Sequence, residues 1–106
     1  ISVMKALPPV LRLARPGWEA LVRVKPQFEA ERVHVRRGVV RDPGVQRKAL
    51  QRVIEAAREW DGETVGVVDS GLPGPKGNRE FFVHLVNRTN ATIPDDCDRW
   101  IADAVG

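Results

Sequence analysis

The chain has 106 residues, which is enough for one domain with a single hydrophobic core. Hydrophobic residues make up 42% and charged residues 29%, as in ordinary soluble domains, and no run of 18 apolar residues predicts a transmembrane helix. The single cysteine, Cys97, excludes an internal disulfide and offers no metal-ligand spacing, so no metal site and a reducing, cytoplasmic location are expected.

The formal net charge is +3, and the positive charge is concentrated in one segment. Within ten residues the chain carries Arg32, His34, Arg36, Arg37 and Arg41, with few acidic neighbours. Such a patch suits a phosphate backbone, and an ordinary solvated surface explains it equally well. The charge pattern alone leaves both interpretations open.

The first predicted elements are a helix, a strand and a long loop. Apolar residues from Val3 to Leu13 follow helical spacing, but Pro8 and Pro9 interrupt it, so we expect a break and then a helix from about Pro9. Residues 18–24 predict an apolar strand of the kind that helices cover on both faces. Residues 25–41 show no regular period and predict a long loop facing a substrate.

A long helix and two further strands follow. Asp42 and Pro43 form a helix start, and apolar residues at three- and four-residue steps predict an amphipathic helix that ends near Asp61. Residues 64–69 and 79–87 predict strands. The order strand, helix, strand, loop, strand indicates an α/β sheet with covering helices.

The last 18 residues depart from the sheet pattern. Asp95 is the predicted cap of a C-terminal helix, and one face of that helix is apolar. This stripe is expected to dock on the sheet, and it consists of Cys97, Trp100, Ile101, Ala104 and Val105.

Three sequence blocks carry a resemblance to a known family. They are Lys25-Pro26-Gln27-Phe28-Glu29, Gly38-Val39-Val40-Arg41-Asp42-Pro43 and Gly74-Pro75-Lys76-Gly77-Asn78-Arg79-Glu80-Phe81. In order and spacing they resemble the TlyA (haemolysin A) family of FtsJ-like ribosomal RNA 2′-O-methyltransferases. Ile1-Ser2 would be the tail of a further motif.

The resemblance implies a fold and a domain organisation. The fold is the C-terminal half of a Rossmann-like S-adenosylmethionine-dependent methyltransferase, a mixed sheet whose last strand is antiparallel and lies between the two before it. Residues 1–106 would form a single partial domain, with family-like elements over 1–88 and a C-terminal extension over 89–106.

The resemblance also implies two catalytic residues. The family uses a Lys-Asp-Lys-Glu tetrad, in which Lys25 matches the second lysine and Glu80 the glutamate. A neutral lysine amine would accept the proton of a ribose 2′-hydroxyl as that oxygen attacks the methyl group of S-adenosylmethionine. Because a close carboxylate favours the charged amine, Glu80 would position the lysine or relay the proton. Without the resemblance, a plain Lys25–Glu80 ion pair is the preferred interpretation.

The expected substrate is ribosomal RNA or a ribosomal subunit. Residues expected to contact it are Gln27, Phe28, Arg36, Arg37, Arg41, Asn78 and Arg79. Phe28 has an aromatic ring on which a base can stack, and Asn78 and Arg79 would position Glu80 or approach a phosphate.

Several parts of the family's site have no counterpart in these residues. They are the glycine-rich cofactor loop, the acidic ribose contact and the first lysine and aspartate of the tetrad. No cofactor-binding residue is therefore assigned, the upstream half of the same protein is expected to complete the site, and the 106 residues alone are expected to be inactive. Two alternatives stay open: a non-catalytic RNA-binding or interaction module that retains the fold, and a membrane-active protein, which no apolar span supports.

Overall fold

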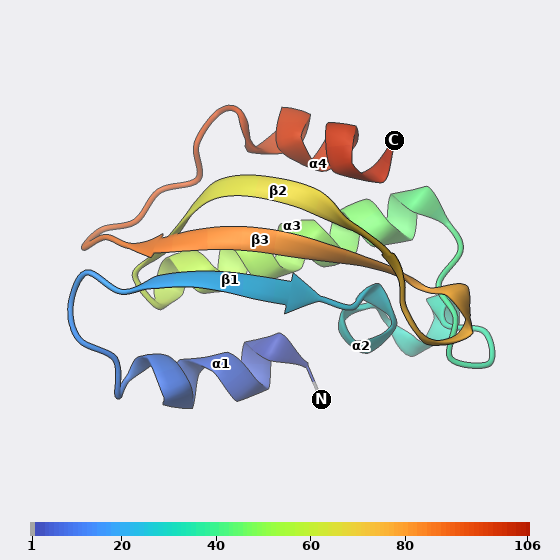
Figure 1. Cartoon of the computed structure of the whole chain (residues 1–106), viewed down its shortest axis with the longest axis horizontal. Coiled ribbons are helices and arrows are strands. Elements are labelled where there is room, and N and C mark those ends of the chain that lie inside the picture. The colour runs from blue at the N-terminus through green and yellow to red at the C-terminus, as the bar shows by residue number, and fades with distance from the viewer. Residues whose placement is uncertain (1) are drawn as a thin grey trace.

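A computed structural model of the chain describes residues 2–106, so Ile1 of the expected motif tail lies outside the described residues. The helices and strands of these residues follow one another in the order α1, β1, α2, α3, β2, β3, α4 (Figure 1). Their bounds are Val3–Leu11 (α1), Glu19–Val24 (β1), Pro26–Glu29 (α2), Pro43–Glu59 (α3), Gly62–Pro73 (β2), Arg79–Asn87 (β3) and Cys97–Val105 (α4). Two short 3₁₀ turns cover Arg32–His34 and Pro75–Gly77.

The three strands of residues 2–106 form one antiparallel sheet in the order β1-β3-β2, and not the mixed sheet that the resemblance implies for the complete domain. The last strand, β3, lies in the middle and is antiparallel to both neighbours, so β1 and β2 run in the same direction. The strand order and direction expected from the resemblance are confirmed.

The core lies between one face of this sheet and the helices. Phe81, Val83 and Leu85 alternate along β3 and are fully buried, because successive side chains of a strand point to opposite faces. They pack in one cluster with apolar residues of α3 and α4. The apolar stripe predicted for α4 docks here, with Cys97, Ile101, Ala104 and Val105 buried and Trp100 partly buried.

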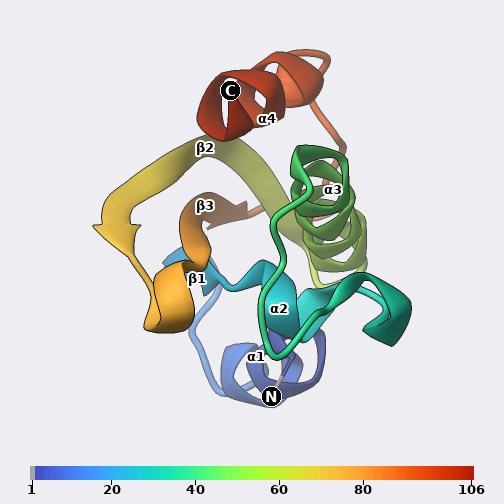
Figure 2. The same ribbon diagram turned by 90° about the vertical axis from the view of Figure 1, so that its right-hand side faces the viewer.

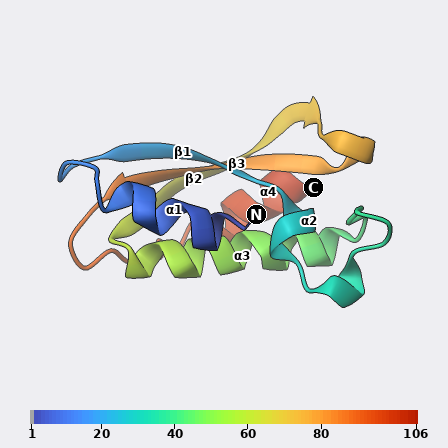
Figure 3. The same ribbon diagram turned by 90° about the horizontal axis from the view of Figure 1, so that it is seen from below.

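The opposite face of the sheet is not covered by any helix of residues 2–106, as Figures 2 and 3 show. Leu21 of β1 is 64% exposed and Val68 of β2 is 56% exposed. Leu21 pairs with His84 and Val68 with Phe82, so these side chains from three strands lie on the same face of the sheet. The expectation that helices cover β1 on both faces is therefore wrong for this part of the protein.

The helix α3 matches the sequence pattern closely. The carboxylate of Asp42 accepts a hydrogen bond from the Gly44 N–H at 2.8 Å, and Pro43 occupies the first turn, where its missing N–H costs nothing. The apolar face predicted from the spacing is buried from Val45 to Ala57.

The helix α1 begins earlier than predicted and contains both prolines. Ser2 caps it by accepting a hydrogen bond from the Met4 N–H at 3.1 Å, so the helix starts at Val3. Pro8 and Pro9 fall in its second half and only remove donors near its end, which follows at Leu11.

Three other segments differ from the sequence-based expectations. The strand β2 covers Gly62–Pro73 and not only 64–69, with an irregularity between Asp69 and Pro73 where Gly71 adopts a positive φ. The loop 25–41 contains α2 and a 3₁₀ turn. The helix α4 begins after Asp96, not Asp95, and no side chain caps it.

Candidate functional site

The two residues expected to be catalytic lie on neighbouring segments, one residue beyond the Val24–Phe81 pair at the carboxyl end of β1. Val24 is the last residue of β1 and pairs with Phe81, so the next position of this antiparallel register sets Lys25 opposite Glu80. Residues opposite each other in such a pair have Cβ atoms about 4.5–5.5 Å apart. By strand alternation both lie on the same side of the sheet as Arg23 and Phe82, which is the uncovered side.

The carboxylate of Glu80 is buried and enclosed by the chain. Glu80 is 7% exposed, and its carboxylate oxygen lies 3.8 Å from Nε of Arg23. On the other side it lies against Gly74, where a Cβ atom would come within 2.4 Å of Oε2. Its ion-pair partner among residues 2–106 is Arg23, and not Lys25 as the simplest interpretation of the sequence had it.

Lys25 stands at the start of a single helical turn, α2. It occupies the N-cap position, and its carbonyl accepts a hydrogen bond from the Phe28 N–H at 2.9 Å. The ammonium group lies 5.6 Å from the centre of the Phe28 ring, within range of a cation–π contact. Phe28 itself is 50% exposed, so one side of Lys25 borders an open aromatic surface.

Hydrogen bonds from the start of α1 and from α3 fix Glu29, the last residue of α2. Glu29 is 3% exposed, and its carboxylate accepts hydrogen bonds from the Ser2 hydroxyl at 2.5 Å and from the Val3 N–H at 2.7 Å. The backbone carbonyl of Glu29 accepts a further bond from the Arg52 guanidinium at 3.2 Å. The turn therefore connects the end of β1 with the first residues of α1 and with α3.

The basic segment forms a second part of the site. Arg36 and Val39 exchange two backbone hydrogen bonds at 2.9 Å, and Arg37 and Gly38 between them adopt positive φ, so the segment is a tight hairpin. Arg36, Arg37 and Arg41 are all exposed.

Asn78 ties this hairpin to the turn that precedes β3. It is 3% exposed, its side-chain oxygen accepts from the Val40 N–H at 3.0 Å and its amide donates to the Gly38 carbonyl at 2.8 Å. Lys76, which the sequence analysis did not single out, donates to the Arg37 carbonyl at 3.0 Å and so adds a cation to the basic surface. The side chain of Asn78 is thus engaged within the protein.

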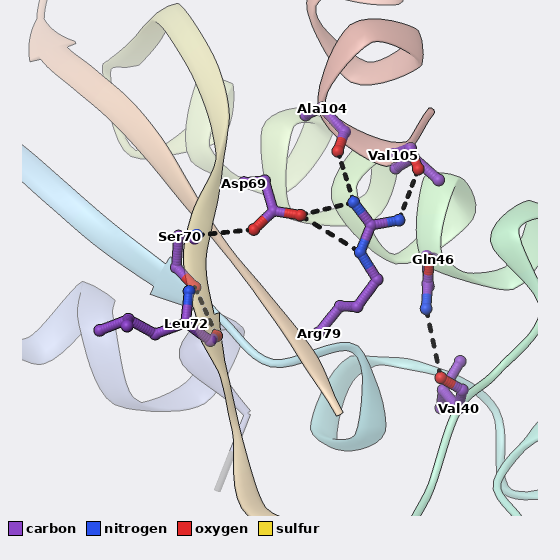
Figure 4. A network of polar contacts seen from close by, with 9 residues as sticks. Val40, Gln46, Asp69, Ser70, Leu72, Arg79, Ala104 and Val105 are labelled. Atoms are coloured by element: carbon purple, nitrogen blue, oxygen red, sulfur yellow. Dashed lines mark hydrogen bonds and ion pairs between the residues drawn. The ribbon is translucent and has the colours of Figure 1, made fainter. Parts of the chain in front are cut away.

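Arg79 reaches toward Asp69 and the carboxyl end of α4, as Figure 4 shows. Its guanidinium bonds the Asp69 carboxylate at 2.5 Å and donates to the carbonyls of Ala104 and Val105 at 2.8 and 2.5 Å. It thereby satisfies the last carbonyls of α4. The hydrogen bond from Arg79, helped by the Gly71 N–H, lowers the pKa of Asp69.

Gln27 is likewise turned inward. Its side-chain oxygen is buried and has no hydrogen-bond partner among the described residues. Phe28 and the exposed arginines thus face open surface, and Glu80 is buried. The polar groups of Gln27 and Asn78 are buried, and the guanidinium of Arg79 is engaged by Asp69 and the end of α4.

The described residues offer little to a metal or a large cofactor beside Lys25. Residues 2–106 contain no group of three or more metal-binding side chains. A groove of about 720 Å³ lies between α3 and α4, on the helical side, and neither Lys25 nor Glu80 lines it. Within the described chain, no helix has the length and apolar character needed to span a bilayer.

The architecture and the paired strand ends define a mixed α/β domain with a candidate polar site at one edge of its sheet. No protein-family model matches the chain. It is 36% identical over 94 residues to the 16S/23S rRNA (cytidine-2'-O)-methyltransferase TlyA of Mycobacterium tuberculosis, covering 88% of this chain and 35% of that protein. It is 40% identical over 86 residues to the Bacillus subtilis protein YqxC, described as "putative rRNA methyltransferase", covering 80% of this chain and 31% of that one.

A solved structure supports the same relationship. The structure of a Lactococcus lactis protein described as "a putative hemolysin" superposes with a TM-score of 0.88 at 32% identity, over 99% of this chain and 50% of that one. The resemblance to the TlyA (haemolysin A) family that the three sequence blocks indicate is thus confirmed, and this chain is a relative of those proteins. It spans about a third of the length of the curated relatives it matches.

Proposed function

We propose that this chain is the catalytic C-terminal half of an S-adenosylmethionine-dependent methyltransferase acting on ribose 2′-hydroxyls of ribosomal RNA. The proposal rests chiefly on the position of Lys25 opposite Glu80 at the end of β1, in a chain whose relatives are named rRNA methyltransferases. It extends to a Rossmann-like fold for the complete domain, with residues 89–106 as an extension of the family-like part.

The proposed chemistry is proton removal from a weak nucleophile. A ribose hydroxyl must lose its proton as its oxygen attacks a methyl group, and a neutral amine at Lys25 would accept that proton. Glu80, held between Gly74 and Arg23, would orient the amine or relay the proton onward. S-adenosylmethionine would supply the methyl group, and because the family's glycine-rich cofactor loop has no counterpart in these residues, none of them is assigned to its binding.

The basic hairpin and Phe28 would hold the RNA. Arg36, Arg37 and Arg41 are exposed, as contacts to a phosphate backbone require. The half-exposed ring of Phe28 offers a stacking surface next to Lys25, and base stacking of this kind contributes about 1–3 kcal/mol. Gln27, Asn78 and Arg79 would act indirectly, by shaping the turn, the hairpin and the strand that carries Glu80.

The upstream half of the same protein would complete the site. The relatives extend well beyond the matched region, and the uncovered side of the sheet, where Lys25 and Glu80 lie, presents apolar side chains such as Leu21 and Val68. We therefore propose that residues 1–106 alone are inactive. A cytoplasmic location follows from the proposed substrate.

The test is methyl transfer by the full-length parent protein to unmodified ribosomal subunits. We expect Lys25→Ala to lower transfer by a factor on the order of 10² or more, the usual contribution of a general base, with cofactor affinity unchanged. Lys48→Ala, which removes an exposed lysine of α3, is the matched control and should retain activity.

Two outcomes would contradict this assignment. Full activity of Lys25→Ala would show that another group takes the proton. A parent that transfers no methyl group while still binding RNA would favour a non-catalytic RNA-binding module that retains the fold.

A further inference from the structure

Glu29 is a charged side chain buried in a position that the proposed chemistry does not use. It is 3% exposed, and among residues 2–106 its carboxylate forms no ion pair. The groups that it contacts are neutral donors, the Ser2 hydroxyl and the Val3 N–H. Burying a carboxylate costs free energy unless its oxygens accept hydrogen bonds. The donors around Glu29 must therefore compensate for its burial.

The start of α1 provides the charge stabilisation that a cation would otherwise provide. The first N–H groups of a helix have no partner within it, and the helix dipole favours a negative charge there. Glu29 satisfies the first of them, at Val3, while the Ser2 hydroxyl that it holds accepts from Met4. The carboxylate and the helix end are therefore matched in charge and in hydrogen bonding.

This contact fixes the turn that begins with Lys25. The turn α2 is only four residues long, with Lys25 as its N-cap and Glu29 as its last residue. A single turn has little stability of its own, because helix nucleation is unfavourable. Its position is instead set by buried Pro26, by the Arg52 contact to the Glu29 carbonyl and by the Glu29 carboxylate. A shift of Glu29 would rotate the whole turn and move Lys25 relative to Glu80.

We propose that Glu29 is a positioning residue for Lys25, an inference that rests on the proposed methyl transfer. Its carboxylate anchors the Lys25 turn to the first residues of α1 and so sets the distance between the lysine amine, Glu80 and the substrate hydroxyl. The residue acts through Lys25 and touches no reacting atom.

The experiment compares variants of the full-length parent. Glu29→Ala removes both accepted hydrogen bonds, and Glu29→Gln keeps the volume and one accepting oxygen but removes the charge. Glu55→Gln is the matched control, because Glu55 is an exposed glutamate of α3 paired with Arg58. Thermal unfolding of each variant shows whether it folds. If Glu29→Ala fails to fold, the comparison is made with Glu29→Gln.

The effects of the substitutions on kcat and on KM distinguish a positioning role of Glu29 from a role in stabilising the fold. A misplaced reacting group costs rate, on the order of 10²-fold for a displacement near 1 Å. Glu29→Ala should therefore lower kcat by a factor of that order and leave the KM for ribosomal subunits within about twofold. Glu29→Gln should lose less, and Glu55→Gln nothing. An unchanged kcat in Glu29→Ala, or a rise in KM alone, would overturn the proposal.

Amide hydrogen exchange tests the anchor independently of activity. Glu29→Ala should speed exchange at Val3, Phe28 and Ala30 and leave the amides of β3 unchanged, whereas Glu55→Gln should change none of them. A parent that transfers no methyl group would refute the proposed function, and the exchange result would still decide whether the anchor exists. Unchanged exchange at Phe28 and Ala30 would refute it in either case.

Discussion

The surroundings of Glu80 depend on the absence of one side chain. Gly74 has an extended backbone that any residue can adopt, so its role is spatial and not conformational. A Cβ atom at this position would lie 2.4 Å from Oε2 and 2.8 Å from the carboxyl carbon of Glu80, well inside van der Waals contact. The carboxylate is thus confined from the Gly74 side.

We expect Gly74→Ala to displace the Glu80 carboxylate and lower methyl transfer by the parent protein about 10- to 100-fold, because small misplacements of catalytic groups are costly. Gly66→Ala is the control, since a Cβ at Gly66 meets no atom within 4 Å. Transfer rate and melting temperature are measured together. Equal activity of Gly74→Ala and Gly66→Ala would show that the carboxylate position does not matter.

For single residues, the sequence indicates which side chains are candidates for the site, but it does not show which groups they contact. Lys25 and Glu80 could be named because they match the second lysine and the glutamate of the family's tetrad. Arg23, Gly74 and Glu29 could not, because each acts through a contact that only the folded chain creates. Glu29, for example, meets Val3 across 26 positions of sequence. Arg79 has an obvious charge, but only the fold shows that it caps α4.

Among the elements, α4 and the segment before it are tied to the sheet by charged side chains. Glu63, near the start of β2, is 9% exposed and accepts hydrogen bonds from the Thr92 N–H and hydroxyl, both at 3.1 Å, and it pairs with Arg88. The hydrogen bond from the Thr92 backbone, followed by those from Arg88 and the Thr92 hydroxyl, lowers the pKa of Glu63.

This shift predicts how stability depends on pH. A carboxylate with a lowered pKa in the folded state stabilises the protein above its ordinary value of 4.5, and this contribution is lost as the pH falls through the lowered pKa. In Glu63→Gln, the free energy of unfolding should therefore fall less steeply as the pH is lowered from neutral to acidic values. Denaturant titration at several pH values measures this slope. Thr92→Val, which removes one of the donors, should reduce the slope less. An unchanged slope in Glu63→Gln would contradict the role of this carboxylate.

Elements were predicted best where local signals and burial agree. The helix α3 has a cap, an N-terminal proline and an apolar face, and its predicted and observed bounds nearly coincide. The helix α1 was misplaced because Ser2 caps it ahead of Val3 and because the two prolines lie inside the helix without interrupting it. The strand β2 was predicted too short because its glycine and proline residues, which usually mark turns, lie in an irregular extended segment.

In residues 2–106, helices cover one face of the sheet and leave the other face exposed. The exposed face presents Leu21 and Val68, both more than half exposed, beside Phe82 and His84. The edge of the sheet at β1 has no further strand among residues 2–106. Exposed apolar surface and free strand edges both favour association.

We expect the isolated 106-residue chain to self-associate through this face as its concentration rises. The double variant Leu21→Lys and Val68→Lys should shift the equilibrium toward monomer, because each lysine places a charge in the contact. Val10→Lys and Leu13→Lys, on exposed apolar residues of the α1 segment, form the matched control. Sedimentation velocity measures the fraction of monomer in the unsubstituted 106-residue chain and in both double variants. If the unsubstituted chain is monomeric at all concentrations, the prediction is wrong.

The strand β3 is the last strand of the chain and the middle strand of the sheet. Among residues 2–106, β1 and β2 are joined only through β3, so this part of the sheet cannot form until residues 79–87 have left the ribosome. The closing contacts are long-range, with Val24 reaching Phe81 and Glu19 reaching Val86, which makes sheet formation slow relative to helix formation. Since Glu80 arrives on that same strand, the nascent protein acquires its hydrogen-bonded sheet and its second candidate catalytic group in a single late event of synthesis.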